Sequence, residues 1–303
     1  MNNKFIQNAI LTQFARGYLQ NSQQKSIANF IAPFVATGAI AGQYKDFADK
    51  NSFALYNTVR AVGGGATRVG FTDTDKNFSC KPNALETMID DIERTPQTDI
   101  ARLEQAKVAS LLSLAIIARD KKVWDMVLSG VPAMSGVGAW SGTGEPIKEL
   151  DAAIQQIITN TGLLPNRMVI GFAAFAALRN NAAMNTLLAG SNTPIATIGK
   201  LQELLIVPNI DIKVGNMVYD TAKRGKADDK VMMIGTEVLI FIGNDSPTQF
   251  DPSFAKTFSV DESGVSSVYT YREDNRRSDI YAVDWTEDPR IVAPSAAARI
   301  TVT

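Results

Sequence analysis

The chain has 303 residues, of which 45% are hydrophobic, and its 30 basic and 31 acidic side chains give a formal net charge of −1. This length provides for one large or two ordinary domains, and the balanced charge gives no overall basic field of the kind that marks nucleic-acid-binding proteins. Histidine is absent and Cys80 is the one cysteine, which excludes histidine-based catalytic triads, histidine metal ligands and an intrachain disulfide.

Residues 1–41 contain short apolar groups at helical spacing, such as Ile6, Ile10 and Phe14, between amide-rich polar residues. We interpret this segment as an arm that becomes ordered on neighbouring copies of the chain, and not as a domain. Its start does not resemble a secretory signal. The longest apolar run, residues 108–118, is too short to span a bilayer, so we expect a soluble cytosolic product.

Residues 43–82 contain strand-like pieces at 44–47 and 68–71, with three glycines at 63–65 between them. This arrangement predicts a long hairpin with a flexible tip. A two-stranded ribbon is only marginally stable alone, so we expect it to rest on other protein surface. The charged residues of this segment are Lys45, Asp46, Asp49, Lys50, Arg60, Arg68, Asp73, Asp75 and Lys76.

A helix of about 30 residues is predicted for residues 98–130, much longer than the average globular helix. Asp99 favours its start, and Gly130 and Pro132 its end. Its middle is apolar nearly all round, which indicates packing on more than one side. The preceding residues, 83–92, alternate apolar and polar side chains and predict a strand.

From residue 145 the pattern changes to alternating helices and short strands, which is typical of a compact α/β unit. The expected helices are 146–161, 172–179 and 196–205, and the expected strands of a covered sheet are 167–171, 210–214, 231–234 and 238–242. Strands at 265–272 and 279–286 follow, joined by a charged loop, and extended chain follows at 290–303. We expect these last strands to return to the long helix.

Glycines at 136–144 and 63–70 lack the spacing of nucleotide-binding loops, so we interpret them as a linker and a hairpin tip. Asp90, Asp91 and Glu93 are either solvated charges near a helix start or, less favoured, ligands of a divalent cation. We expect Trp124 and Trp140 to be core residues, Cys80 to be a small, partly buried apolar residue, and Asp228 and Asp229 to lie in an exposed turn.

The basic side chains around residue 272 alternate with acidic ones, which favours an interface between copies or a solvated loop over phosphate binding. The candidate interface residues are Lys45, Asp46, Arg60, Arg68, Asp73, Asp75, Arg272, Glu273, Arg276 and Arg277. No carboxylate precedes Asp46, so Lys4, Arg16 and Lys25 are candidates for a surface that meets DNA phosphates. We predict no catalytic residue, cofactor or metal site.

The order of these features resembles the major capsid proteins of tailed bacteriophages, and the similarity extends over nearly the whole chain. The segments that carry it are IAPFVATGAIAGQYKDF, the glycine-tipped hairpin, FSCKPNALETMIDDIE, ARLEQAKVASLLSLAIIARDKKVW, PIKELDAAIQQIITNTGLLPNRMVIGFAAFAALRN and YREDNRRSDIYAVDWTEDPRIVAP.

This resemblance implies the α+β HK97-type capsid fold. Its parts would be an N-terminal arm at 1–41, an extended β-hairpin loop at 42–81, a peripheral domain at 82–144 and 251–303 with a spine helix at 98–128, and an α/β axial domain at 145–250. The family makes hexamers and pentamers that close into an icosahedral shell around double-stranded DNA. Such a protein would be assembled in the bacterial cytoplasm and reside in the virion.

No scaffold-like segment precedes the arm, so the resemblance implies that any scaffolding function lies in a separate protein or a removed segment. Portal and decoration proteins are further expected partners, a membrane is not, and a covalent cross-link between subunits stays open. Two alternatives remain. One is an encapsulin-like shell that houses an enzyme, and the other, much less favoured because histidine and nucleophile motifs are absent, is a small-molecule-binding α/β protein.

Overall fold

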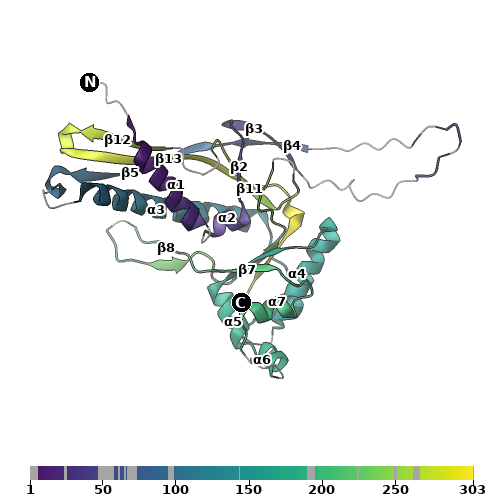
Figure 1. Ribbon diagram of the computed structural model, residues 1–303. Helices are drawn as coiled ribbons and strands as arrows, with labels where there is room; N and C mark the ends of the chain where they lie inside the picture. Colours follow the sequence, from purple (N-terminus) through teal and green to yellow (C-terminus); the bar gives the residue numbers. More distant parts are fainter. Residues whose placement is uncertain are drawn as a thin grey trace.

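The computed structural model describes residues 6–23, 26–46, 58–60, 62–64, 66, 74–94, 99–142, 144–189, 195–223, 225–248, 251–261 and 267–302. The chain is a mixed α+β protein (Figure 1). Its α-helices are α1 (Ala9–Gln23), α2 (Ile27–Ile31), α3 (Ile100–Gly130), α4 (Pro146–Thr161), α5 (Phe172–Asn180), α6 (Ala182–Leu188) and α7 (Ile198–Leu204).

Its strands fall into four sheets. The largest contains β1 (Ile6–Gln7), β2 (Phe34–Ala36), β5 (Lys81–Asp90), β11 (Ala255–Ser259), β12 (Ser267–Glu273) and β13 (Ser278–Ile291). A four-stranded sheet contains β6 (Arg167–Gly171), β7 (Asp211–Gly215), β10 (Glu237–Phe241) and β14 (Ala297–Thr301). Two ribbons pair β3 (Ala41–Asp46) with β4 (Thr74–Ser79) and β8 (Val218–Asp220) with β9 (Lys230–Met232).

The long helix α3 confirms the predicted spine. The Asp99 side chain caps its start by accepting a hydrogen bond from the backbone N–H of Arg102 at 3.2 Å. The helix ends at Gly130, where a Cβ atom would lie only 2.2 Å from the Ile291 side chain. Val108 and Val123 are fully buried in different clusters, so α3 is packed on more than one part of its surface.

The largest sheet lies along α3, and we call the two together, with the elements that pack on them, the spine unit (Figure 1). Its central strand β13 pairs with β12 on one side and β5 on the other, both antiparallel. The alternation predicted around β5 is present: Ile89 is buried beside α3, whereas Met88 is 50% exposed. One sheet face is therefore built into the core by period-two spacing.

The N-terminal segment packs on its own chain. Leu11, Ala15 and Leu19, which lie on one face of α1, are buried against α3 and β13. β1 pairs with β12 and β2 runs parallel to β11. The expectation that this segment becomes ordered only on neighbouring copies is therefore wrong for its described residues, because its helical apolar spacing already fits the surface of α3.

The four-stranded sheet and α4–α7 form a second unit below one end of α3, which we call the α/β unit (Figure 1). The bounds predicted for α4 and β6 match the structure. The fully buried side chains of Leu150, Ile154 and Ile157 on α4 pack on one sheet face, in a cluster with Met168 and Ile240. The other sheet face packs towards α2 and the end of α3.

Three expected strand assignments are wrong. The predicted strand 231–234 is not in the covered sheet, because β9 pairs with β8 in an exposed ribbon. The extended chain after residue 290 does not all return to α3, since β14 joins the four-stranded sheet beside β10. The partner of β3 is β4 at Thr74–Ser79, whereas the predicted partner, 68–71, lies outside the described residues.

The glycine-rich segment between α3 and α4 is an irregular connection, as predicted. Trp140 is fully buried there and donates a hydrogen bond from Nε1 to Glu149 Oε2 at 2.6 Å. Trp124 is also a core residue, with 3% exposure. Asp228 and Asp229 lie in the exposed turn between β8 and β9, and Cys80 is buried, donating from Sγ to the Phe258 carbonyl at 3.4 Å.

Candidate assembly surfaces

The β3–β4 ribbon is held at its base by aromatic packing. The Phe78 ring stacks on Phe258 with a centroid distance of 4.5 Å, and the Tyr44 ring lies 5.2 Å from the same ring. A Cβ atom on Gly42, which is opposite Phe78 in the ribbon, would lie 2.8 Å from the Phe78 ring. The base is therefore fixed to β11 of the spine unit, as the marginal stability of a lone ribbon requires.

The candidate interface residues of this ribbon are only partly described. Lys45 and Asp75 face each other across it, with Nζ and Oδ1 3.1 Å apart. Asp46 is the last residue of β3, and Arg60 is exposed. Arg68 and Asp73 lie outside the described residues. Lys45, Asp75 and Arg60 thus place charge of both signs on the described part of the ribbon and of the segment between its strands.

The second group of candidate residues surrounds the turn between β12 and β13. Arg272 forms a bidentate ion pair with Asp91, in which Nη1–Oδ1 and Nη2–Oδ2 are both 2.6 Å apart. Asp279 and Asp274 also lie within 3.5 Å of the Arg272 guanidinium. Arg276 pairs with Glu273 at 3.5 Å, and exposed Arg277 adopts a left-handed backbone conformation with φ of 49°. Arg272 and Arg276 therefore form ion pairs within their own chain.

This ion-pair network is solvent-exposed. The hydrogen bond from Arg272 lowers the pKa of Asp91, and the same contact raises the pKa of Arg272. Solvent screens exposed ion pairs of this kind, so they contribute little to stability. The network therefore gives the turn a defined charge pattern at its surface more than it stabilises the fold.

The three acids considered as a cation site have other partners. Asp90 accepts a hydrogen bond from the Ile92 backbone N–H at 2.9 Å, and Asp91 is engaged by Arg272. Glu93 lies 3.4 Å from Lys107. Within the described part of the chain, acidic and cysteine side chains do not gather in a group of three or more that could hold a metal ion.

Of the three cations proposed to meet DNA, the structure describes one. Arg16 is exposed on α1, on the helix surface away from the buried Ala15. Lys4 and Lys25 lie outside the described residues. That these three residues meet DNA therefore stays a prediction.

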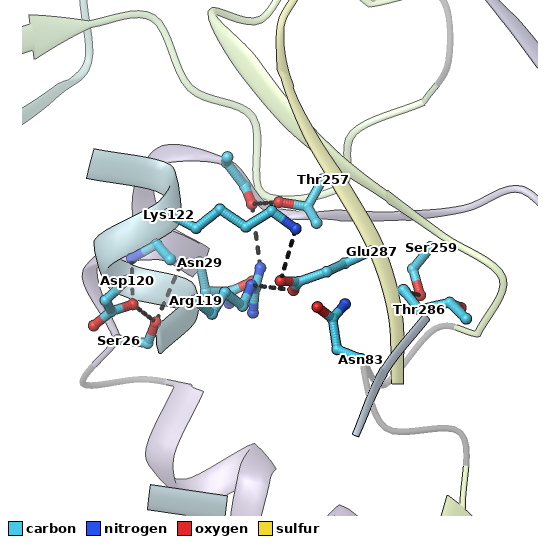
Figure 2. A network of polar contacts seen from close by, with 12 residues as sticks. Ser26, Asn29, Asn83, Arg119, Asp120, Lys122, Thr257, Ser259, Thr286 and Glu287 are labelled. Carbon is cyan, nitrogen blue, oxygen red and sulfur yellow. Dashed lines mark hydrogen bonds and ion pairs between the residues drawn. The ribbon is translucent and has the colours of Figure 1, made fainter. Parts of the chain in front are cut away.

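Sequence reasoning missed a buried polar cluster between α2, α3 and β13 (Figure 2). Ser26 Oγ and the Ala28 N–H both donate to Asp120 Oδ1, at 2.6 and 2.9 Å. Arg119 lies 3.6 Å above the Phe34 ring and 3.5 Å from Glu287 Oε2. The sequence carries one signal of this cluster. Arg119 and Asp120 are charged, yet their helical spacing from Ala115 and Val123 puts them on the apolar face of α3.

Burial governs the electrostatics of this cluster. Burial lowers the pKa of Arg119 to about 10, although the nearby carboxylates of Glu287 and Asp120 oppose the shift. Burial also raises the pKa of Asp120, against the hydrogen bonds from Ser26 and α2. Lys122 adds a second cation at 3.3 Å from Glu287 Oε1 (Figure 2). The cluster thus joins three elements through charges that little solvent reaches.

The described helices do not include one with both the length and the apolar character needed to cross a membrane. No protein-family model matches the chain. The major capsid protein of Burkholderia phage BcepMu is 26% identical over 296 residues, which cover 92% of this chain and 91% of that protein. This relationship extends across both units.

Solved structures show the same fold. A phage-related protein from Bordetella bronchiseptica superposes with a TM-score of 0.75 and 23% identity, covering 98% of both chains. The capsid structure of cyanophage P-SCSP1u gives a TM-score of 0.57 with 11% identity, covering 92% of this chain and 88% of that one. Both comparisons cover nearly all of this chain, so they concern the whole architecture and not one unit.

The fold alone does not separate a phage shell from an encapsulin. The SrpI encapsulin from Synechococcus elongatus gives a TM-score of 0.53 with 12% identity, covering 99% of this chain and 91% of that one. The near-full-length sequence relationship is with a phage protein. The chain therefore has the HK97-type capsid fold, and its sequence is similar over nearly its whole length to that of a phage major capsid protein.

Proposed function

We propose that copies of this chain assemble through hexamers and pentamers into a closed icosahedral shell around double-stranded DNA, and that the chain has a structural and not a catalytic role. The observation that carries the proposal is the similarity to a phage major capsid protein over 92% of the chain. A closed shell spreads modest contacts over a large interface area, which suits a subunit with a net charge near zero.

The parts of the proposed subunit follow from its elements. Residues 1–41 would be the arm, 42–81 the extended loop, 82–144 and 251–296 the peripheral domain, and 145–250 the axial domain. Because β14 pairs with β10, residues 297–301 belong with the axial domain in this proposal. The charges at the ribbon and at the β12–β13 turn would set the register between neighbouring subunits.

We infer that Lys4, Arg16 and Lys25 face the packaged DNA, because they precede every carboxylate of the chain and Arg16 is exposed. Deleting the whole segment would expose the apolar contacts of α1, so charge removal is the sharper test. Replacing all three by Gln should lower DNA retention without preventing assembly. Replacing Lys148, Lys226 and Lys230 by Gln is the matched control, and equal retention in both triple variants would refute the assignment.

Scaffolding, portal and decoration proteins are further partners of the proposed shell, which would be assembled in the host bacterial cytoplasm. An enzyme cargo in place of a genome is the competing function. Cargo from native particles separates the two, because DNA supports the phage shell and one enriched enzyme supports an encapsulin-like shell.

Assembly itself is tested by expressing the chain with and without its neighbouring phage genes and imaging the products by electron microscopy after size-exclusion chromatography. We expect closed shells, or hexameric and pentameric rings when a required partner is missing. Monomers that stay monomeric in the presence of all neighbouring gene products would contradict the proposal.

A further inference from the structure

The short helix α2 lies in the corner between the spine unit and the α/β unit (Figure 1). Its residues Ile27, Ala28, Phe30 and Ile31 are all buried. A five-residue helix has almost no stability of its own, so contacts with its surroundings must fix its position. Those contacts reach both units.

On the spine side, α2 is tied to α3 through its N-terminus. Ser26 is the N-cap, and its hydroxyl and the Ala28 N–H both donate to Asp120 Oδ1. At the other end of α2, Arg119 donates to the Ala32 carbonyl at 3.4 Å (Figure 2). Two adjacent residues of α3 thus hold the two ends of α2.

On the side of the α/β unit, Phe30 is the main contact. Its ring lies 5.0 Å from the Arg167 guanidinium and 4.4 Å from Lys213 Nζ, distances typical of cation–π contacts. The ring also meets Phe241 edge-on at 5.8 Å. In addition, the Phe30 carbonyl accepts a hydrogen bond from Arg167 Nη1 at 2.8 Å. These partners belong to three adjacent strands, β6, β7 and β10.

A third set of contacts joins the end of α2 to β11. The Thr257 hydroxyl donates to the Ala32 carbonyl at 2.8 Å, and the Thr257 N–H donates to the Pro33 carbonyl at 2.9 Å. The segment that leaves α2 is therefore held by backbone as well as side-chain hydrogen bonds. Tilting the α/β unit relative to α3 would break at least one of the three sets of contacts.

We propose that α2 is a clasp that fixes the angle between the spine unit and the α/β unit, and that loosening its contacts with either unit lets this angle vary. α2 also belongs to the buried cluster in which the end of α3 meets the four-stranded sheet, so the polar and aromatic contacts of α2 add to direct packing between the two units. The clasp concerns the geometry within one chain, so its test does not require a shell.

The test measures the distance between spin labels on the two units by double electron–electron resonance. Ser110→Cys on α3 and Asn185→Cys on α6 provide exposed attachment points. Native Cys80 is 2% exposed, and the chain without added cysteines checks that it stays unlabelled. Labelled chains are diluted with unlabelled chains, so that only distances within one chain are recorded.

Phe30→Leu keeps an apolar side chain but removes the aromatic ring that contacts the α/β unit. Ser26→Ala removes the hydroxyl that caps α2 and donates to Asp120 of α3. We expect each to broaden the distance distribution about twofold, because more orientations become populated. Phe14→Leu is the matched control. Phe14 lies on α1 in the same N-terminal segment, but it packs with Tyr18 and with the buried cluster beside α3.

Broadening in Phe30→Leu and Ser26→Ala with a narrow distribution in Phe14→Leu supports the clasp. Unchanged distributions in both α2 variants would overturn it, and so would equal broadening in Phe14→Leu. Circular dichroism checks folding, and if Phe30→Leu does not fold, Ser26→Ala decides in the same way. Shell formation is not part of this readout, so failure of the clasp leaves the proposed assembly standing.

Discussion

Gly171 ends β6 where the backbone of the turn before β10 crosses it. A Cβ atom at this position would lie 2.2 Å from the carbonyl oxygen of Gly235 and 2.7 Å from its carbonyl carbon. Backbone atoms cannot move aside as the end of a flexible side chain can, and the Gly235 carbonyl is held by a hydrogen bond from the Ala174 N–H at 3.0 Å. We therefore expect Gly171→Ala to lower the free energy of unfolding by roughly 1–3 kcal/mol, measured by urea denaturation.

Gly199→Ala is the control for this prediction. Gly199 lies in α7, and a Cβ atom there would have no atom within 4 Å. Alanine should leave stability unchanged or raise it by up to about 1 kcal/mol, because it favours the helix. If both variants lose stability equally, the crossing at Gly235 is not the cause.

The carboxylate of Asp120 gives a prediction that depends on pH. Burial raises its pKa above the ordinary value of 3.8. An acid with a raised pKa in the folded state binds more protons folded than unfolded, so its contribution to stability is largest below pH 3.8 and falls as pH rises through the folded pKa. Asp120→Asn keeps an oxygen acceptor for Ser26 and α2 but removes this titration.

We expect the free energy of unfolding of the native chain, relative to Asp120→Asn, to fall as pH is raised from about 4 towards neutrality. Urea denaturation across this range measures the difference directly. Asp125→Asn, at an exposed position of the same helix, controls for the general effect of removing a charge. If the difference in the free energy of unfolding between the native chain and Asp120→Asn is the same at every pH, burial does not raise the pKa of Asp120.

The same cluster shows what sequence cannot supply at the residue scale. Arg119 and Asp120 read as ordinary helix charges, because their burial depends on where α2 and β13 cross α3. The Arg272 group was recognised as mixed-charge, but its partner Asp91 is 181 residues away in sequence. The charge pattern therefore indicates the mixed character of the Arg272 group, whereas only the tertiary structure decides which contacts it makes and which charges become buried.

At the scale of elements, periodic segments were predictable and isolated strands were not. The bounds of α4 and β6 follow from caps and apolar spacing that lie within the segments themselves. By contrast, β14 reads as a short extended segment, and its sheet is chosen by pairing with β10. Residues 231–234 are all apolar and read as a covered strand, yet Val231 and Met232 lie in the exposed ribbon beside β8, whereas Met233 and Ile234 are buried.

The ribbon formed by β3 and β4 depends on Phe78. This ring is 2% exposed and is stacked on Phe258, so Phe78→Ala should cost about 3 kcal/mol locally. The loss should concentrate in the ribbon, because a two-stranded ribbon is only marginally stable and Phe78 is part of the aromatic packing that fixes its base. Hydrogen exchange should therefore speed up in β3 and β4 well before it changes in α3.

Asn77→Ala is the control at the neighbouring, exposed position of β4. It should leave hydrogen exchange in the ribbon close to that of the native chain. Protection that survives in Phe78→Ala would mean that the ribbon is held elsewhere, for example by the Lys45–Asp75 pair.

At the scale of the whole molecule, the described structure separates folding from assembly. Each unit has a buried cluster of its own, a further cluster is shared between them, and the N-terminal segment contributes to the spine cluster and to the shared one within one chain. The exposed charges of the ribbon and of the β12–β13 turn contribute little to this core. Substitutions at these exposed positions should therefore change how copies meet without changing how one copy folds.

Arg60→Glu tests this separation. Arg60 is exposed in the segment between β3 and β4, so the substitution should leave the thermal unfolding midpoint unchanged. If the ribbon approaches a neighbouring subunit through complementary charge, reversal should slow assembly roughly tenfold at low salt, and added salt should reduce the difference. Light scattering follows the rate and electron microscopy identifies the products. Lys148→Glu, an exposed reversal on α4, should assemble at the native rate. Native assembly of Arg60→Glu at low salt would remove this residue from the interface.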